Sequence, residues 1–223
     1  MQSLHEAGAK SGIFNQAFMW MFVGLALTGA SASFVASNQR IANDLYSSFT
    51  PFIILAVIEL GLVIYLSARI TKMSYGSALT GYLIYSLING LTMGSIFLYY
   101  TTSSVAAAFF TTALTFGVMA LYGYRTKRDL TSAGSIGLML LIGLIIAYLI
   151  NLWLKSDTLT YVLSFISIGI FTVLTAYDAQ KIKRLEYESD NQNLGILGAL
   201  TIYLDFINIF LDMLRFFGKR RRD

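Results

Sequence analysis

Seven stretches of mostly apolar residues follow one another along the chain, and each is about the 20 residues that an α-helix needs to cross a bilayer. They lie at 13–36, 50–70, 77–100, 104–124, 133–154, 159–180 and 194–217. The connections between them are short, so we expect a single transmembrane domain over 13–217. A polar tail, 1–12, precedes it and a basic tail, 218–223, follows it. The pattern predicts an all-α integral membrane protein.

Composition agrees with this prediction. Of the 223 residues, 56% are hydrophobic and 13% are charged, and the mean hydropathy is +0.65. A soluble domain carries about 25% charged residues. The net charge of +4 then reflects membrane topology, and we expect a lipid bilayer as the main partner and no nucleic acid. The chain has no cysteine, and its one histidine, His5, lies in the polar tail. This argues against zinc or copper and for calcium or magnesium as any bound metal, with no other cofactor.

The basic residues between the spans predict the orientation, because loops on the cytoplasmic side are enriched in Lys and Arg. One side of the membrane would carry Lys10, Arg69, Lys72, Arg125, Lys127, Arg128, Lys181, Lys183 and Arg184, and the other Arg40 and Lys155. We therefore predict a cytoplasmic N-terminus. The basic run 219–222 conflicts with this if the seventh segment crosses fully, whereas a re-entrant seventh segment would keep that run inside. The sequence favours seven helices and leaves the side of the C-terminus open.

A few ionisable residues lie within the apolar spans, where each costs at least about 2.5–3.5 kcal/mol at a helix centre. They are Glu59, Asp178, Asp205, Asp212 and Arg215, with Arg69 at the end of the second span. On the last segment, Asp205, Asp212 and Arg215 join Thr201 and Asn208 in one narrow polar stripe of an otherwise apolar helix. The stripe indicates a helix buried inside the bundle. A helix lying flat on the membrane surface is the alternative.

Asp178 and Asp205 can form a pair. The midpoint between them falls in the polar turn 188–193, so an antiparallel hairpin would place both carboxyl groups at the same depth. Two carboxylates in contact away from water cannot both ionise cheaply, and we expect them to share a proton in a pH-sensitive latch. Alternatively, Asp178 extends separately into the headgroup region.

Partners for the remaining ionisable residues are weaker inferences. Arg215 or Arg69 could pair with Glu59, and Asp212 and Arg215, three residues apart, could pair with each other.

Two motifs resemble the signature of the Bax inhibitor family in its bacterial form. They are Thr175-Ala-Tyr-Asp-Ala-Gln-Lys-Ile-Lys183 and Gly198-Ala-Leu-Thr-Ile-Tyr-Leu-Asp-Phe-Ile-Asn-Ile-Phe-Leu211. The resemblance implies six helices around a central seventh, an inner-membrane location and a pH-dependent calcium leak. It also implies that Asp178 and Asp205 are the pH-sensing pair. The family's second-span acid and arginine and its seventh-span arginine correspond to Glu59, Arg69 and Arg215.

Three functions compete. The first is a calcium leak channel gated by the Asp178–Asp205 pair, whose carboxylates could also bind the ion transiently, with a cation path along the stripe from Asp205 to Asp212. The second is a modulator or scaffold for membrane proteases or stress pathways, with other membrane proteins as partners. The third is an intramembrane aspartyl protease, but the glycine-flanked aspartate and the Pro-Ala-Leu element of those enzymes are missing. We expect the leak and no enzymatic activity.

Overall fold

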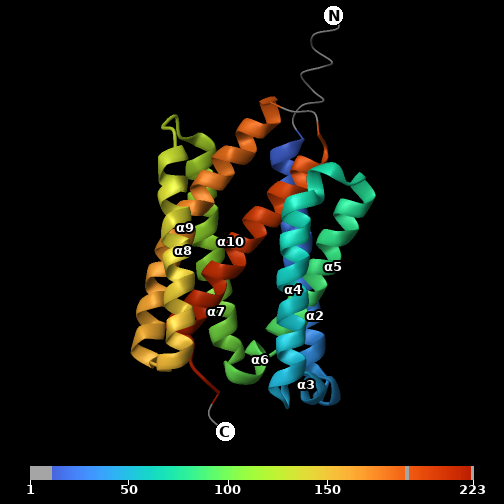
Figure 1. The fold of residues 1–223 in the computed structure, drawn as a ribbon, viewed down its shortest axis with the longest axis vertical. Helices are drawn as coiled ribbons and strands as arrows, with labels where there is room; N and C mark the ends of the chain where they lie inside the picture. Colours follow the sequence, from blue (N-terminus) through green and yellow to red (C-terminus); the bar gives the residue numbers. More distant parts are fainter. Residues whose placement is uncertain (1–11, 189–190, 222–223) are drawn as a thin grey trace, which may run out of the picture. The chain divides into compact units, whose positions relative to one another are not determined.

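The computed structural model describes residues 12–188 and 191–221. Seven of its helices are long and apolar enough to span a membrane. They are α2 (Ile13–Ser37), α4 (Phe49–Arg69), α5 (Tyr75–Met93), α7 (Thr102–Arg125), α8 (Thr131–Leu154), α9 (Asp157–Glu188) and α10 (Asn193–Phe217). Within the described residues there is no β-strand, only an isolated bridge between Tyr100 and Arg220. The predicted all-α class and seven spans are confirmed (Figure 1). Predictions on His5, Lys10, the rest of the tail before Gly12 and the last two residues lie outside the described residues.

The structure departs from the predicted elements in four places. The polar loop after α2 contains a helix, α3 (Gln39–Tyr46), whose cap Asn38 accepts a hydrogen bond from the backbone nitrogen of Ile41. The third span consists of α5 and the short helix α6 (Ile96–Tyr99). A 3-10 turn, η1 (Ile70–Lys72), extends the second span. Finally, α9 runs eight residues past the predicted end at 180, because the polar sequence there consists mainly of good helix formers.

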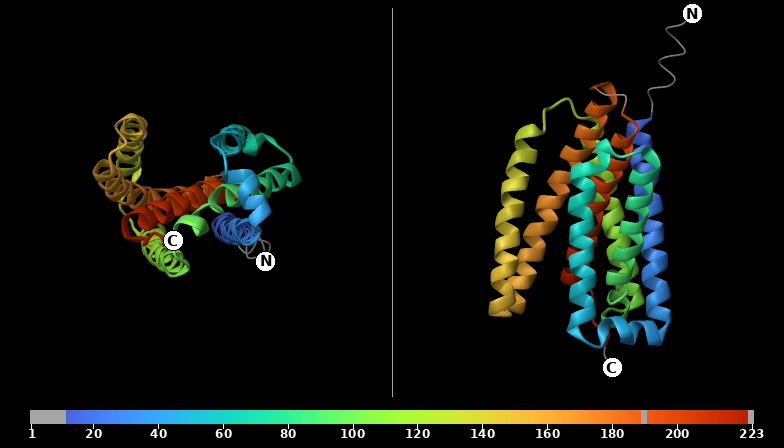
Figure 2. Two further views of the ribbon diagram at one scale, coloured as in Figure 1. Left: turned by 90° about the horizontal axis from the view of Figure 1, so that it is seen from below. Right: turned by 45° about the vertical axis from the view of Figure 1, so that its right-hand side comes forward.

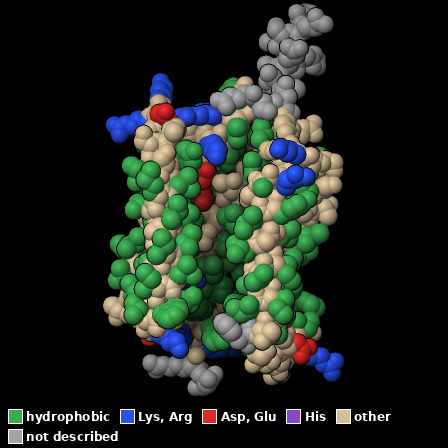
Figure 3. Space-filling model, in the orientation of Figure 1, with side chains coloured by type: hydrophobic (Ala, Val, Ile, Leu, Met, Phe, Trp, Pro, Cys, Tyr) green, Lys and Arg blue, Asp and Glu red, His purple; other side chains and the backbone are tan. Residues whose placement is uncertain are grey.

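Contacts divide the chain into two compact units. One contains the described part of 1–101, 185–203 and 220–223, and the other contains 102–184 and 204–219. The first thus holds α2 to α6 and the beginning of α10, and the second holds α7, α8, nearly all of α9 and the rest of α10. Apolar side chains cover the visible sides of the long helices, as a membrane-embedded surface requires (Figure 3).

In the first unit, α5 packs against both α2 and α4 (Figure 1). Glycines make the α2–α5 approach close. A Cβ atom added at Gly24 would lie 2.1 Å from the hydroxyl oxygen of Tyr82, and one at Gly90 would lie 2.5 Å from the carbonyl oxygen of Thr28. This close packing of small residues is typical of helix association in lipid.

The two ends of α10 lie at opposite ends of the third span. At its beginning, Asn193 Nδ2 donates to the carbonyl oxygens of Ile70 and Met73, at 2.8 and 2.7 Å, beside the turn between α4 and α5. Beyond its end, the backbone nitrogen of Arg221 donates to the carbonyl oxygen of Tyr99 at 2.8 Å, at the end of α6. The seventh segment therefore crosses fully, and the re-entrant alternative is wrong.

In the second unit, small residues bring α9 against α7 and α8. A Cβ atom at Gly123 of α7 would lie 2.0 Å from the carbonyl oxygen of Ala176, and one at Gly134 of α8 would lie 2.5 Å from the ring of Tyr177. In Figure 2, α8 and α9 run alongside each other in both views. The apolar window of α10 is 72% buried, the highest value of the seven spans, so the alternative of a helix lying flat on the membrane surface is wrong.

Candidate functional site

The segment around Asp178 is fixed by several specific contacts of α9. Thr175 Oγ1 donates to the carbonyl oxygen of Phe171 on its own helix at 2.8 Å. One turn further, the buried Gln180 holds the connection between α7 and α8. Its Nε2 donates to the carbonyl oxygen of Arg128 at 2.8 Å, and its Oε1 accepts from the backbone nitrogen of Leu130 at 2.9 Å. Together with the close contact at Ala176, the two bonds of Gln180 fix the rotation of α9.

Aromatic packing fixes the corresponding segment of α10. The ring of Phe206 contacts those of Phe109 and Phe116 on α7, with centroids 5.5 and 5.6 Å apart. This face of α10 is therefore held against α7. The neighbouring Asp205 is turned into the interior of the unit and is only 5% exposed.

The carboxyl groups of Asp178 and Asp205 lie within hydrogen-bonding reach of each other. Asp178 is 8% exposed, and Asp205 Oδ2 is buried without any N–H or hydroxyl donor among the described residues. Two carboxylates have no proton to share, so a hydrogen bond between these groups requires that one of them is protonated. The alternative in which Asp178 extends separately into the headgroup region is wrong. Lys181, three residues along α9, lies close enough to attract the Asp178 carboxylate.

A second charged site lies near the end of α10. Arg215 Nη1 donates to Asp212 Oδ1 at 2.9 Å, so the predicted local pair is confirmed. The hydroxyl of Tyr148 on α8 donates to the same oxygen at 3.1 Å, and the guanidinium of Arg215 lies 5.8 Å from the centre of the Tyr148 ring. Asp212 is only 3% exposed, so these donors offset the cost of burying its charge.

Glu59 is held by polar side chains of α5 instead of an arginine. Its carboxylate accepts hydrogen bonds from Asn89 Nδ2 and from Thr92 Oγ1, the latter at 2.8 Å. Among the described residues, neither Glu59 nor Arg69 takes part in an ion pair, and Arg215 pairs with Asp212. The predicted pairing of Glu59 with Arg69 is therefore wrong, and its pairing with Arg215, which lies in the other unit, stays a prediction.

The hydrogen bonds of Glu59 continue into a chain of buried polar groups that sequence reasoning missed. Asn89 Oδ1 accepts from the hydroxyl of Tyr203 on α10 at 2.9 Å, and that hydroxyl lies 2.6 Å from Thr28 Oγ1 on α2. Four spans of the first unit thus share one network. The available signal was the presence of Asn89 and Thr92, three residues apart within an apolar span, where a polar side chain needs a partner.

The polar stripe of α10 is not one continuous network. Thr201 Oγ1 donates to the carbonyl oxygen of Leu197 at 3.0 Å, and Asn208 Nδ2 donates to that of Leu204 at 2.8 Å. Both residues are therefore satisfied by the backbone of their own helix. Among the described residues, no group of three or more His, Cys, Asp or Glu side chains could hold a metal ion.

Seven helices long and apolar enough to span a membrane, with a buried carboxyl pair on the last two, define a polytopic membrane protein with ionisable groups within its apolar spans. A model of the family described as "Inhibitor of apoptosis-promoting Bax1" matches residues 10–222. The chain belongs to this family, the Bax inhibitor-1 family.

Relatives in several bacteria cover nearly the whole chain. The inner membrane protein YbhL of Escherichia coli K12 is 45% identical over 212 residues, which is 92% of this chain and 91% of YbhL. A protein of Borreliella burgdorferi is 38% identical over 227 residues, covering 100% of this chain and 98% of its own length. A protein of Rickettsia prowazekii is 41% identical over 208 residues, covering 92% and 88%. The family resemblance expected from the two aspartate motifs is confirmed.

Proposed function

We propose that this protein is a slow, pH-sensitive calcium leak channel in which Asp178 and Asp205 form the gate. The observation that carries the proposal is that these two buried carboxyl groups, on neighbouring spans, lie within hydrogen-bonding reach of each other. With one shared proton, the pair joins α9 and α10 through a short, charge-assisted hydrogen bond. Without that proton the two groups repel each other, so the helices can separate. The leak therefore increases as the pH rises.

Calcium acts in this proposal as a passing ion. Ca²⁺ takes six to eight oxygen ligands, and two carboxyl groups supply only part of that shell, so water must supply the rest. Once deprotonated, Asp178 and Asp205 offer hard oxygen ligands and negative potential at the same position. Glu59, Arg69, Asp212 and Arg215 are then charged groups that modulate the path and do not hold the ion. No resident cofactor is proposed.

The test is calcium flux into liposomes containing the purified protein, measured over a series of pH values. We expect the flux to increase with pH in the wild type and to lose its pH dependence in the double variant Asp178→Asn, Asp205→Asn. Asp44→Asn is the matched control, since Asp44 is an exposed aspartate of α3. It should leave the pH response unchanged. A double variant with the wild-type response would refute gating by the pair, and an infrared titration of the two carboxyl groups would then show whether they share a proton.

Proteolysis is the second candidate, because two aspartates that share a proton also suit general acid–base hydrolysis. We propose transport and no enzymatic activity, since the flanking motifs of intramembrane aspartyl proteases are missing from the sequence. Incubation with single-span membrane substrates separates the two. Cleavage that disappears in Asp178→Asn would favour the protease, and intact substrate together with pH-dependent flux would favour the leak.

We further propose that the protein lies in the bacterial inner membrane, as YbhL does, with its N-terminus in the cytoplasm. The loop basic residues support this orientation, whereas the basic run 219–222 would lie on the opposite side of the membrane if α10 crosses it fully. Because the chain has no cysteine, the single-cysteine variants Lys127→Cys and Lys155→Cys can report the orientation of the protein in the membrane. An impermeant thiol reagent added to spheroplasts should label Lys155→Cys and not Lys127→Cys, and the reverse labelling would refute the orientation.

A further inference from the structure

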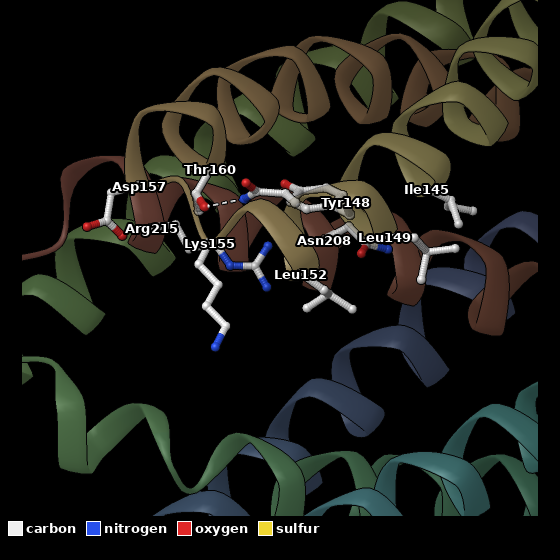
Figure 4. Close-up of a pocket in the computed structure, with 10 residues that line it drawn as sticks. Ile145, Tyr148, Leu149, Leu152, Lys155, Asp157, Thr160, Asn208 and Arg215 are labelled. Carbon is white, nitrogen blue, oxygen red and sulfur yellow. Dashed lines mark hydrogen bonds between the residues drawn. The ribbon is translucent and has the colours of Figure 1, made fainter.

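A pocket of about 790 Å³ lies in the second unit, between the end of α8, the beginning of α9 and the last turns of α10. One end of the pocket is lined by the charged side chains of Lys155, Asp157 and Arg215. The other end is lined by the aliphatic side chains of Ile145, Leu149 and Leu152 (Figure 4). Ile145 precedes Lys155 by ten residues and so lies about 15 Å deeper along the helix axis. The pocket therefore runs from a charged mouth towards the apolar part of the membrane.

The mouth of this pocket lies at the level of the lipid headgroups. Trp153, two residues before Lys155, is 91% exposed on a helix that is otherwise apolar at this end. Exposed tryptophans at span ends sit at the membrane–water interface. The aliphatic lining is exposed as well, with Leu149 at 56% and Leu152 at 70%, so the pocket is open to the acyl chains of surrounding lipids.

The charged end favours an anion. Among the described residues, Lys155 and Asp157 form no ion pair, and in Figure 4 Lys155 extends away from the helices. Arg215 uses Nη1 for Asp212, which leaves other N–H groups of the planar guanidinium for a second acceptor. An ammonium group and a guanidinium fork are the groups that bind phosphate oxygens well. Asp157 is the one acid of the lining, and Asp212 balances the charge of Arg215, so Lys155 is the cation that an incoming anion would contact first.

The backbone holds Lys155 in an unusual conformation. It has φ 48° and ψ 37°, and it is the only non-glycine residue with positive φ in the described chain. Glycine or asparagine usually occupies such a position at the end of a helix. The buried Asn151 supports the turn, with Nδ2 2.7 Å from Thr160 Oγ1 and Oδ1 accepting from the backbone nitrogen of Ser156 at 3.2 Å. A lysine in a backbone conformation that disfavours it is a structural outlier, and such outliers cluster at functional sites.

We propose that this pocket binds an anionic phospholipid, with the phosphate held by Lys155 and Arg215 and an acyl chain lying along Ile145, Leu149 and Leu152. This inference is independent of the calcium leak. Lipid binding here would hold the end of α10 against the turn between α8 and α9.

The experiment is intact-protein mass spectrometry of the purified chain in detergent, titrated with phosphatidylglycerol, phosphatidylcholine or glycerol 3-phosphate. We expect the wild type to bind phosphatidylglycerol about tenfold more tightly than phosphatidylcholine, because the choline group adds a positive charge that neutralises the headgroup and is repelled by Lys155 and Arg215. Binding of glycerol 3-phosphate should be much weaker, because it cannot use the aliphatic end. Binding of glycerol 3-phosphate as tight as that of phosphatidylglycerol would overturn the lipid assignment in favour of a soluble phosphate.

The variants separate the pocket from general charge effects. Lys155→Asn removes the cation and suits the left-handed backbone, so the protein should fold and lose about tenfold in phosphatidylglycerol affinity. Lys155→Arg keeps the charge and should retain binding. Lys127→Asn makes the same charge change at an exposed loop position between α7 and α8 and should bind like the wild type. Equal affinity of Lys155→Asn and the wild type, or equal affinity for the two phospholipids, would overturn the proposal.

Discussion

The closest approach between α7 and α9 predicts how a single methyl group affects the carboxyl pair. A Cβ atom at Gly123 would lie 2.0 Å from the carbonyl oxygen of Ala176 and 2.8 Å from its carbonyl carbon, and real Cβ contacts essentially never fall below 3.0 Å. Gly123→Ala must therefore push the two helices apart by about 1 Å. The obstructing atoms are backbone, so no side-chain rotation can relieve the clash. Overpacking of this kind costs about 1–3 kcal/mol, and we expect the upper half of that range.

The same displacement affects Asp178, which lies two residues beyond Ala176 on α9. The oxygen–oxygen distance in a hydrogen bond varies over only about 0.5 Å. A shift of about 1 Å therefore breaks the contact with Asp205. Thermal unfolding of the purified protein should show a Tm lower by about 4–12 °C for Gly123→Ala, using about 2–4 °C per kcal/mol for a chain of this size. In liposomes, the variant should leak calcium with a weakened response to pH.

The matched control lies on the same helix. An added Cβ atom at Gly117 would have no atom within 4 Å, so Gly117→Ala should keep its Tm or gain slightly from the better helix propensity of alanine, by up to about 1 kcal/mol. Its leak should remain that of the wild type. The reasoning is refuted if Gly123→Ala unfolds at the same temperature as Gly117→Ala and retains the full pH response.

Three further predictions concern polar contacts. Asn89→Ala removes a donor from the half-buried Glu59 carboxylate and should lower the free energy of unfolding by about 1–3 kcal/mol in a denaturation experiment; a loss below about 0.5 kcal/mol would contradict the network. Arg215→Gln should destabilise the protein more than Asp212→Asn does, since it leaves a buried carboxylate without its cation, and a larger loss for Asp212→Asn would refute this order. Hydrogen bonds from the side chain and backbone of Thr131 and from the guanidinium of Arg184 lower the pKa of Asp129 below its ordinary 3.8. The stability it contributes is thus present above that pH and lost as the pH falls further, and a carboxyl NMR titration with a midpoint at or above 3.8 would contradict it.

The spans could be predicted from the sequence because their signal is local. Runs of about 20 apolar residues identify membrane helices whatever surrounds them, and the seven predicted segments correspond to the seven observed. The ends of the helices could not be predicted where helix-forming polar residues continue past the apolar run, as they do in α9 after 180. The missed helix α3 has no such run, and its signal was only the cap Asn38 at the beginning of a short polar segment.

The contacts between spans were predictable only where sequence separation fixed them. Asp178 and Asp205 lie at equal distances from one turn, so hairpin geometry placed them together. Arg215 reaches Asp212 because helix periodicity brings residues three apart onto one face. The partners of Glu59 lie on α5, and no periodicity relates them to the second span, so charge complementarity led to the wrong choice of Arg69. Amide and hydroxyl donors satisfied the carboxylate instead.

In the proposed function, the hydrogen bonds along α10 confine the pH sensitivity to one contact. Thr201 and Asn208 bond to carbonyl oxygens of their own helix, and neither bond depends on pH. Asp212 receives donors from Arg215 and Tyr148, which satisfy it as an anion. Asp205 differs, because its described partner is another acid, and that bond exists only while one proton is present. A change in proton concentration can therefore break a single interhelical contact while the rest of the stripe keeps its bonds, which is the property that a proton-controlled gate between α9 and α10 requires.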